Sequence, residues 1–283
     1  MADAVTLHSD AVTVDLLDAE IMDQLVSQLV MAALVRHVNF DGNKTKKMRK
    51  KDTFVATTAA EATDHTRQNY TQSSPATLTV GEVKVYAEQS DLNRDFSPMT
   101  SAEMIEAAVY AVRKKYDGDI CALFSGFSTG VGTTTVDLTP TALRTAFADL
   151  EINDVPTGYC AVLHPTQIDN INAVLLQSAC PVWTMTELSI LNGQRAQANG
   201  YKGLFLNVPI FSTTNVATVN SSADYCGAAI GIGQAIAVGE DGRGIRTESA
   251  RAIQSGKTCF AVNLYFDAKE AEDLAGVKIV SAV

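Results

Sequence analysis

Long apolar runs and charged residues are both scarce in this 283-residue sequence. The longest strongly apolar stretch, Leu29 to Val35, is far shorter than the roughly 20 residues that a membrane-spanning helix needs. No basic region followed by an apolar stretch opens the chain, so we expect neither a signal peptide nor a membrane partner. Charged residues make up 19% of the chain, below the usual share of about 25%, which indicates extensive contacts between subunits.

A catalytic signature is also missing. Cys160 and His164 lie four residues apart on one face of a predicted strand, where a metal site or a Cys/His nucleophile pair is conceivable. No second pair has ligand spacing, and His164 precedes Pro165, where a helix cap is the simpler role. The remaining histidines are isolated: His8, His37 and His65. We therefore expect no catalytic residue, no metal site and no cofactor.

Two glycine-rich segments resemble nucleotide-binding loops only in part. Gly231-Ile232-Gly233 begins like a dinucleotide fingerprint, but Ile236 replaces the third glycine. The segment from Gly126 to Gly132 lacks the Lys-Ser/Thr pair of a phosphate loop. Both segments are predicted to be tight turns or close-packing sites, and the neighbouring carboxylates Glu240-Asp241 are expected to be solvated.

The five cysteines are odd in number and widely spaced, and most sit in apolar runs, so we expect free, buried thiols in a reducing compartment. They are Cys121, Cys160, Cys180, Cys226 and Cys259. Apolar residues make up 46% of the chain, enough for a sizeable core.

The net charge of −10 argues against nonspecific nucleic-acid binding as a default. Six of the 22 basic residues are nevertheless concentrated in one short run, the basic strip: Lys44, Lys46, Lys47, Arg49, Lys50 and Lys51. The strip has two interpretations. It is either a solvated charge run or an electrostatic docking surface for an acidic neighbouring subunit or for nucleic acid.

The first half of the chain is predicted to combine two helices with a polar excursion. Apolar spacing predicts a helix from Asp15 to His37. Residues 53–95 are rich in small polar side chains, yet carry β-type residues late in the segment, so we expect an extended hairpin that depends on other surfaces for support. A helix follows, with Thr100 and Glu103 at capping-box spacing and Asp117-Gly118 as its end. Ile120 to Phe124 is predicted to be a buried strand.

The second half alternates strands and helices opened by proline. Pro209 marks an edge strand or a strand end. The predicted elements are a helix from Thr139-Pro140 to Leu150, a strand from Tyr159 to Leu163, a helix opened by Pro165, strands from Leu204 to Phe211 and from Lys257 to Phe266, a helix from Ala268 to Ala275 and a strand from Val277 to Val280.

The order of these elements over residues 15–283 resembles that of tailed-bacteriophage major capsid proteins with the Hong Kong 97-type fold. The resemblance rests on shared order and spacing, not on one motif. The segments that carry it are Tyr159 to Pro165 leading into Ile168 to Ile171, Leu206 to Ser212, Tyr225 to Gly231, and Arg243 to Arg251 followed by Lys257 to Phe266.

This resemblance implies a mixed α+β fold divided into an N-terminal arm (1–52), an extended loop (53–95), a peripheral domain with a spine helix (96–135), an axial domain (136–244) and the return strands of the peripheral domain (245–283). It implies a structural subunit, not an enzyme, which assembles as pentamers and hexamers into an icosahedral virion head around double-stranded DNA. The expected partners are further copies, a scaffolding protein, a portal, a cement protein and nonspecifically packaged DNA, with assembly in the host cytoplasm. Two alternatives stay open: an encapsulin-like nanocompartment shell, and a cytosolic α/β enzyme using Cys160 or His164.

Overall fold

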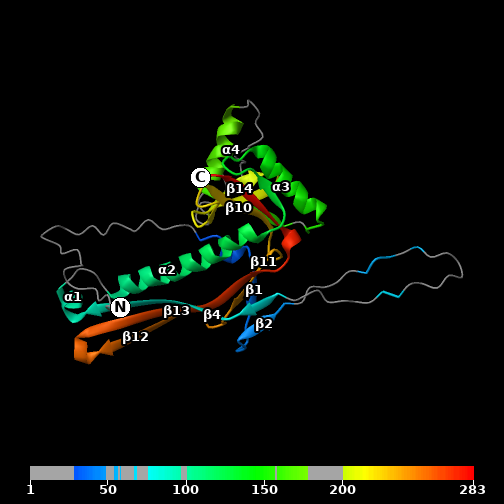
Figure 1. Ribbon diagram of the computed structural model, residues 1–283. Coiled ribbons are helices and arrows are strands. Elements are labelled where there is room, and N and C mark those ends of the chain that lie inside the picture. The colour runs from blue at the N-terminus through cyan, green and yellow to red at the C-terminus, as the bar shows by residue number, and fades with distance from the viewer. Residues whose placement is uncertain are drawn as a thin grey trace.

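Two sheets dominate the fold, an elongated one of five strands and a more compact one of seven (Figure 1). The computed structural model describes residues 29–48, 54–56, 58, 67–68, 76–96, 101–156, 158–177 and 200–283. Within these residues, no helix is both long and apolar enough to cross a membrane.

The elongated sheet is built around β13 (Lys257–Glu270). On one edge β13 pairs antiparallel with β4 (Gly81–Ser90). On its other edge it pairs antiparallel first with β12 (Arg246–Ala252) and then with β11 (Ile236–Glu240). A short strand, β1 (Arg36–Asn39), adds in parallel to β11. The sheet thus joins segments more than 200 residues apart in the sequence.

The long helix α2 (Ser101–Ala122) lies along this sheet and covers β4 and β13 (Figure 1). The Tyr116 and Phe266 rings lie 4.9 Å apart, centroid to centroid. The predicted end of the helix at Asp117-Gly118 is wrong, and so is the predicted strand from Ile120 to Phe124. The helix continues to Ala122 and then tightens into a 3-10 turn, η3 (Leu123–Gly126).

Tertiary packing explains this continuation. Ile120, Cys121 and Phe124 are fully buried, and their burial outweighs the roughly 1 kcal/mol that a glycine costs inside a helix. Asp117 is turned inward instead of capping a terminus. Gly118 lies inside α2, so it makes no turn here.

The seven-stranded sheet has the order β5-β14-β10-β6-β8-β7, with β9 also on β10. Its strands are β5 (Gly130–Gly132), β6 (Tyr159–Leu163), β7 (Tyr201–Phe205), β8 (Val208–Ser212), β9 (Thr218–Val219), β10 (Asp224–Gly231) and β14 (Gly276–Ala282). Helices α3 (Pro140–Ile152) and α4 (Pro165–Gln177) pack with one face of the sheet, and the other face contributes to the core beneath α2. Because both faces are covered, β6 is apolar on both sides.

Several local predictions are confirmed. The strand from Tyr159 to Leu163 has the predicted bounds. Thr139 caps α3 by accepting a hydrogen bond from the Ala142 amide at 3.3 Å. The predicted strand from Leu204 to Phe211 is wrong, because the chain turns at Leu206 and Asn207 between β7 and β8. Pro209 is the second residue of β8, just before its pairing with β6 begins at Ile210.

Two predicted helices are wrong where the structure describes them. Most of the helix from Asp15 to His37 lies outside the described residues, but its end forms a 3-10 turn, η2 (Met31–Ala33), followed by β1. In place of the helix from Ala268 to Ala275, β13 continues to Glu270 and a short turn follows, η5 (Asp273–Ala275). In both places pairing with β11 overrides the local pattern.

The polar excursion divides into a root and a projection. At the root, β2 (Thr45–Lys47) pairs antiparallel with β3 (Thr77–Thr79), and the Met48 amide donates to the Ala76 carbonyl at 2.7 Å. The described parts of the projection, 54–56 and 67–68, lie well away from both sheets in Figure 1. The apolar end of the excursion is not a separate hairpin arm, because β4 joins the elongated sheet and is followed by α1 (Asp91–Phe96).

Neither sheet comes from one continuous stretch of sequence. β11 follows β10 directly in the chain but pairs in the elongated sheet. β14 follows β13 but pairs with β10 and β5 in the seven-stranded sheet. The chain therefore crosses between the two sheets at both places.

Candidate assembly interface

The basic strip begins at the root of the excursion. Lys46 is engaged within the chain, since its ammonium group donates to the Asn39 carbonyl at 2.6 Å and to the Asp41 carboxylate at 2.8 Å. Lys44 and Lys47 are exposed on either side of it. The other strip residues, Arg49, Lys50 and Lys51, lie outside the described residues. In the described part of the strip, Lys44 and Lys47 are therefore exposed, whereas Lys46 stabilises the turn between β1 and β2.

A second group of charges, which sequence reasoning missed, lies on the turn between β11 and β12. Asp241 accepts a hydrogen bond from Arg243 Nε at 3.0 Å and forms an ion pair with Arg246. Burial acts to raise the pKa of Asp241, but the hydrogen bonds and positive charge of the two arginines outweigh it and lower the pKa. The expectation that Asp241 is simply solvated is therefore wrong. The close spacing of Asp241, Arg243 and Arg246 in the sequence could have indicated this ion-pair cluster.

Glu240, at the end of β11, is also engaged. Its carboxylate accepts a hydrogen bond from the Tyr116 hydroxyl at 2.5 Å and lies 3.1 Å from His37 Nδ1. Burial and the adjacent Glu240 raise the pKa of Tyr116. His37 is thus not isolated, as its other ring nitrogen lies 2.6 Å from the Ala32 carbonyl. This cluster joins α2, β1 and β11 directly behind the arginine turn.

Cys160 and His164 do not form a common site. Cys160 is fully buried in the core beneath α2, and burial raises the pKa of its thiol to about 12, so it stays protonated at neutral pH. His164 instead caps α4, since its Nδ1 accepts from the Thr166 amide at 3.2 Å. Gln167 reaches back to accept from the His164 amide at 3.1 Å, which completes a capping-box arrangement.

The other candidate sites have structural roles as well. Gly231 to Gly233 forms the turn between β10 and β11, and Gly130–Gly132 is strand β5, packed closely on β14. Throughout the described ranges, no group of three or more His, Cys, Asp or Glu side chains is arranged to hold a metal ion.

The thiols supply a direct test of this packing. We expect Cys121, Cys160 and Cys226 to resist alkylation by iodoacetamide in the native protein, because all three are buried and burial raises their pKa values. Cys259 is only partly buried and should react first among the four described cysteines. Peptide mass spectrometry after a timed exposure measures the order, and denatured protein, in which all thiols react, is the control. Early labelling of Cys160 would contradict this packing and reopen the nucleophile interpretation.

Comparison with solved structures identifies the fold. The capsid of the cyanophage P-SCSP1u superposes with a TM-score of 0.70 at 12% identity, covering 94% of this chain and 92% of that one. The capsid of Ralstonia phage GP4 gives 0.71 at 9% identity, covering 100% and 98%. The SrpI encapsulin of Synechococcus elongatus gives 0.67 at 11% identity, covering 91% of each chain.

At the level of sequence there is no such match: no family model and no curated protein corresponds to this chain. Identities of this size establish the fold alone. The superpositions span both chains nearly end to end. This chain therefore has the mixed α+β Hong Kong 97-type fold of tailed-bacteriophage major capsid proteins, as its order of elements predicts.

Proposed function

We propose that this chain is the major capsid subunit of a tailed bacteriophage and assembles as pentamers and hexamers into an icosahedral head around double-stranded DNA. The observation that carries the proposal is the nearly full-length match to phage capsids in both directions. A projection with little apolar surface of its own gains stability when it lies across a neighbouring copy, where new contacts offset its ordering entropy.

The exposed apolar side chains support a role in assembly. At the projection, Phe54 and Val55 are 63% and 69% exposed. Leu92, Phe96 and Ile253 are exposed in α1 and in the turn between β12 and β13. Exposed large apolar side chains that gather in one place are typical of protein–protein contacts.

We assign the elongated sheet and α2 to the peripheral domain, and the seven-stranded sheet with α3 and α4 to the axial domain. Under this assignment β11 is peripheral and β14 is axial, in line with their pairing. The further expected partners are a scaffolding protein, a portal and a cement protein. The subunit would assemble in the host cytoplasm and become part of the virion.

A second candidate function is an encapsulin-like shell that encloses cargo enzymes. The match to the SrpI encapsulin favours it, because its TM-score is close to those of the phage capsids. The two functions differ in what the shell contains and in whether a scaffold is needed.

Negative-stain electron microscopy separates these functions. We would express the chain alone, and then with its genomic neighbours. Closed shells some tens of nanometres across support the proposal, and dependence on a co-expressed scaffold favours a virus over an encapsulin. If only small soluble particles form under every condition, the capsid proposal fails.

The basic strip provides a prediction within this function. Substituting Gln at five strip positions and retaining Lys46 should reduce shell yield or genome retention several-fold: Lys44, Lys47, Arg49, Lys50 and Lys51. The substitution should also make assembly less sensitive to salt, because salt screens exposed charges beyond about 10 Å at 0.1 M. Particle counts across a salt series measure both effects. The matched control substitutes Gln at exposed lysines of β4 and α2, Lys84 and Lys114. Equal behaviour of the two variants would identify the strip as a solvated charge run.

A further inference from the structure

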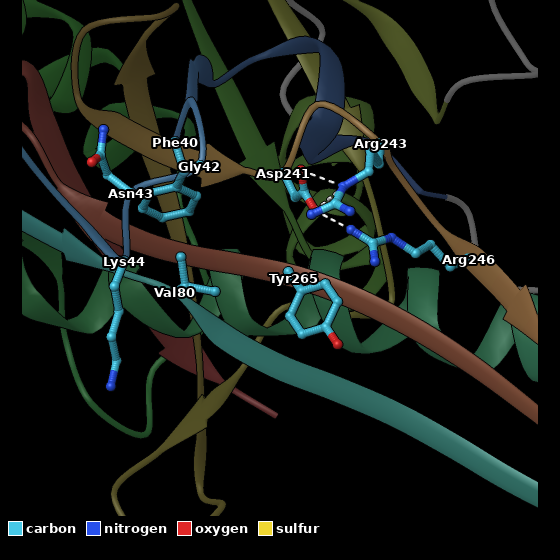
Figure 2. Close-up of a pocket in the computed structure, with 9 residues that line it drawn as sticks. All are labelled: Phe40, Gly42, Asn43, Lys44, Val80, Asp241, Arg243, Arg246 and Tyr265. Carbon is cyan, nitrogen blue, oxygen red and sulfur yellow. Dashed lines mark hydrogen bonds and ion pairs between the residues drawn. The ribbon is translucent and has the colours of Figure 1, made fainter.

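A pocket of about 320 Å³ opens where the root of the excursion meets the turn between β11 and β12 (Figure 2). Phe40, Val80 and Tyr265 supply apolar and aromatic surface. Arg243 and Arg246 lie together beside Asp241, whereas Lys44 lines the opposite side and its side chain points away from the two arginines (Figure 2). The volume is at the lower end of the range for binding pockets and suits a side chain with its adjoining backbone.

Arg246 is held in a fixed position within this pocket. Its guanidinium group pairs with Asp241, and its central carbon lies 5.2 Å from the centre of the Tyr265 ring. Its Nε–H is buried and has no hydrogen-bond partner among the described residues. A buried donor without a partner costs roughly 1–3 kcal/mol, so an acceptor that reached it would be bound favourably.

The pocket is positively charged in an acidic protein. Three basic residues line it, Lys44, Arg243 and Arg246, but only one acidic residue, Asp241, which pairs with the two arginines. The chain as a whole has a net charge of −10. The chemistry that fits is therefore a carboxylate, which an arginine binds with two parallel hydrogen bonds.

The amino-terminal segment of this same protein is a source of carboxylates without neighbouring Lys or Arg. Residues 1–28 contain no Lys or Arg but six acidic side chains: Asp3, Asp10, Asp15, Asp18, Glu20 and Asp23. We propose that the pocket formed by Arg243, Arg246, Lys44 and Tyr265 binds a carboxylate from residues 1–28 of a second copy. This rests on the proposed function, since a shell of identical subunits holds that segment next to its neighbours at high local concentration.

Zero-length crosslinking of the full chain tests this proposal. Arg243 has a 71% exposed side chain, so Arg243→Lys is expected to be tolerated, and it places an amine in the pocket for carbodiimide coupling. Shells or other oligomers are assembled from equal amounts of ¹⁴N- and ¹⁵N-labelled subunits, crosslinked, digested and analysed by mass spectrometry. We expect crosslinks from position 243 and from Lys44 to acidic residues of 1–28, with about half of them joining unlike isotopes, because subunits mix at random.

Internal controls are available on the same sheet. Lys84, an exposed lysine of β4, should give few crosslinks to residues 1–28. Arg246→Gln in the Arg243→Lys background should lower the crosslink yield at position 243 several-fold. Arg251→Gln, at an exposed arginine of the same strand β12 that pairs with Asp91, should leave it unchanged. Equal losses from the two substitutions would indicate a general structural effect and overturn the pocket's role.

Three further outcomes overturn the inference. Crosslinks joining only like isotopes would place the chain's own segment in the pocket. Crosslinks to acidic residues elsewhere would identify a different segment. Coupling in empty shells that disappears in DNA-filled shells would point to phosphate as the natural occupant. The experiment distinguishes the inference from the proposed function. Mixed-isotope crosslinks in the absence of closed shells would support the inference and refute the capsid role.

Discussion

Replacing residues 49–75 with a short Gly-Ser turn should abolish closed shells while the body of the protein stays folded. The geometry of the root makes this replacement feasible. β2 and β3 pair as the two strands of a hairpin, with Lys47 opposite Thr77, and hairpin strands accept connections of about 2–5 residues. The Thr79 amide also donates to Asp267 at 2.8 Å, which anchors the root to β13 after the projection is removed.

The physical reason for the lost assembly is that the described part of the projection exposes large apolar side chains. Phe54 and Val55 are 63% and 69% exposed in the single chain. The Gln68 side chain links the two arms, because it accepts from the Val55 amide at 3.0 Å and donates to the Val55 carbonyl. Contacts with a neighbouring copy would therefore be lost, whereas the two cores would be preserved.

Electron microscopy and thermal unfolding measure the two halves of this prediction. We expect shells to fall to the detection limit, with a melting temperature within about 3 °C of the unmodified protein, which corresponds to roughly 1 kcal/mol in a chain of this size. The deletion must end before Thr77, because β3 begins there and β4 follows from Gly81. Shells of normal diameter from the shortened chain would show that the projection is dispensable.

Asp117→Ala should destabilise the fold more than any other single change considered for this protein. Asp117 is only 1% exposed, and one carboxylate oxygen accepts hydrogen bonds from the amides of Val30 and Met31 at 3.1 and 2.8 Å. The other oxygen accepts from the Asn215 side chain at 2.8 Å. The substitution leaves three donors without their acceptor, so we expect a loss of about 2–4 kcal/mol in unfolding free energy.

Chemical denaturation measures this loss, and a melting temperature roughly 5–15 °C lower is the thermal counterpart. Asp119→Ala, two residues along the same helix, is the matched control. Asp119 is partly exposed and pairs with Lys115 at the surface, an arrangement worth less than about 1 kcal/mol. Similar losses for the two variants would contradict the role of Asp117.

The sequence alone determined the elements whose signals are local. The strand at Tyr159 and the helix opened by Pro165 depend on a short apolar run, a proline without an amide hydrogen and a capping side chain, all within a few residues. The order of such elements was enough to indicate the capsid fold. Composition likewise indicated buried thiols, because cysteines within apolar runs are rarely exposed.

Tertiary structure decided everything that depends on a distant partner. The end of a predicted helix forms β1 instead, because it pairs with the edge of β11, 200 residues later. Helix α2 continues beyond Gly118, because the surface beneath it is apolar. The pocket unites Lys44 with Arg243, Arg246 and Tyr265, and no local pattern brings those residues together. Propensity and periodicity act over one or two turns of chain, whereas the pairing of remote strands is set by the burial and hydrogen bonding of the whole fold.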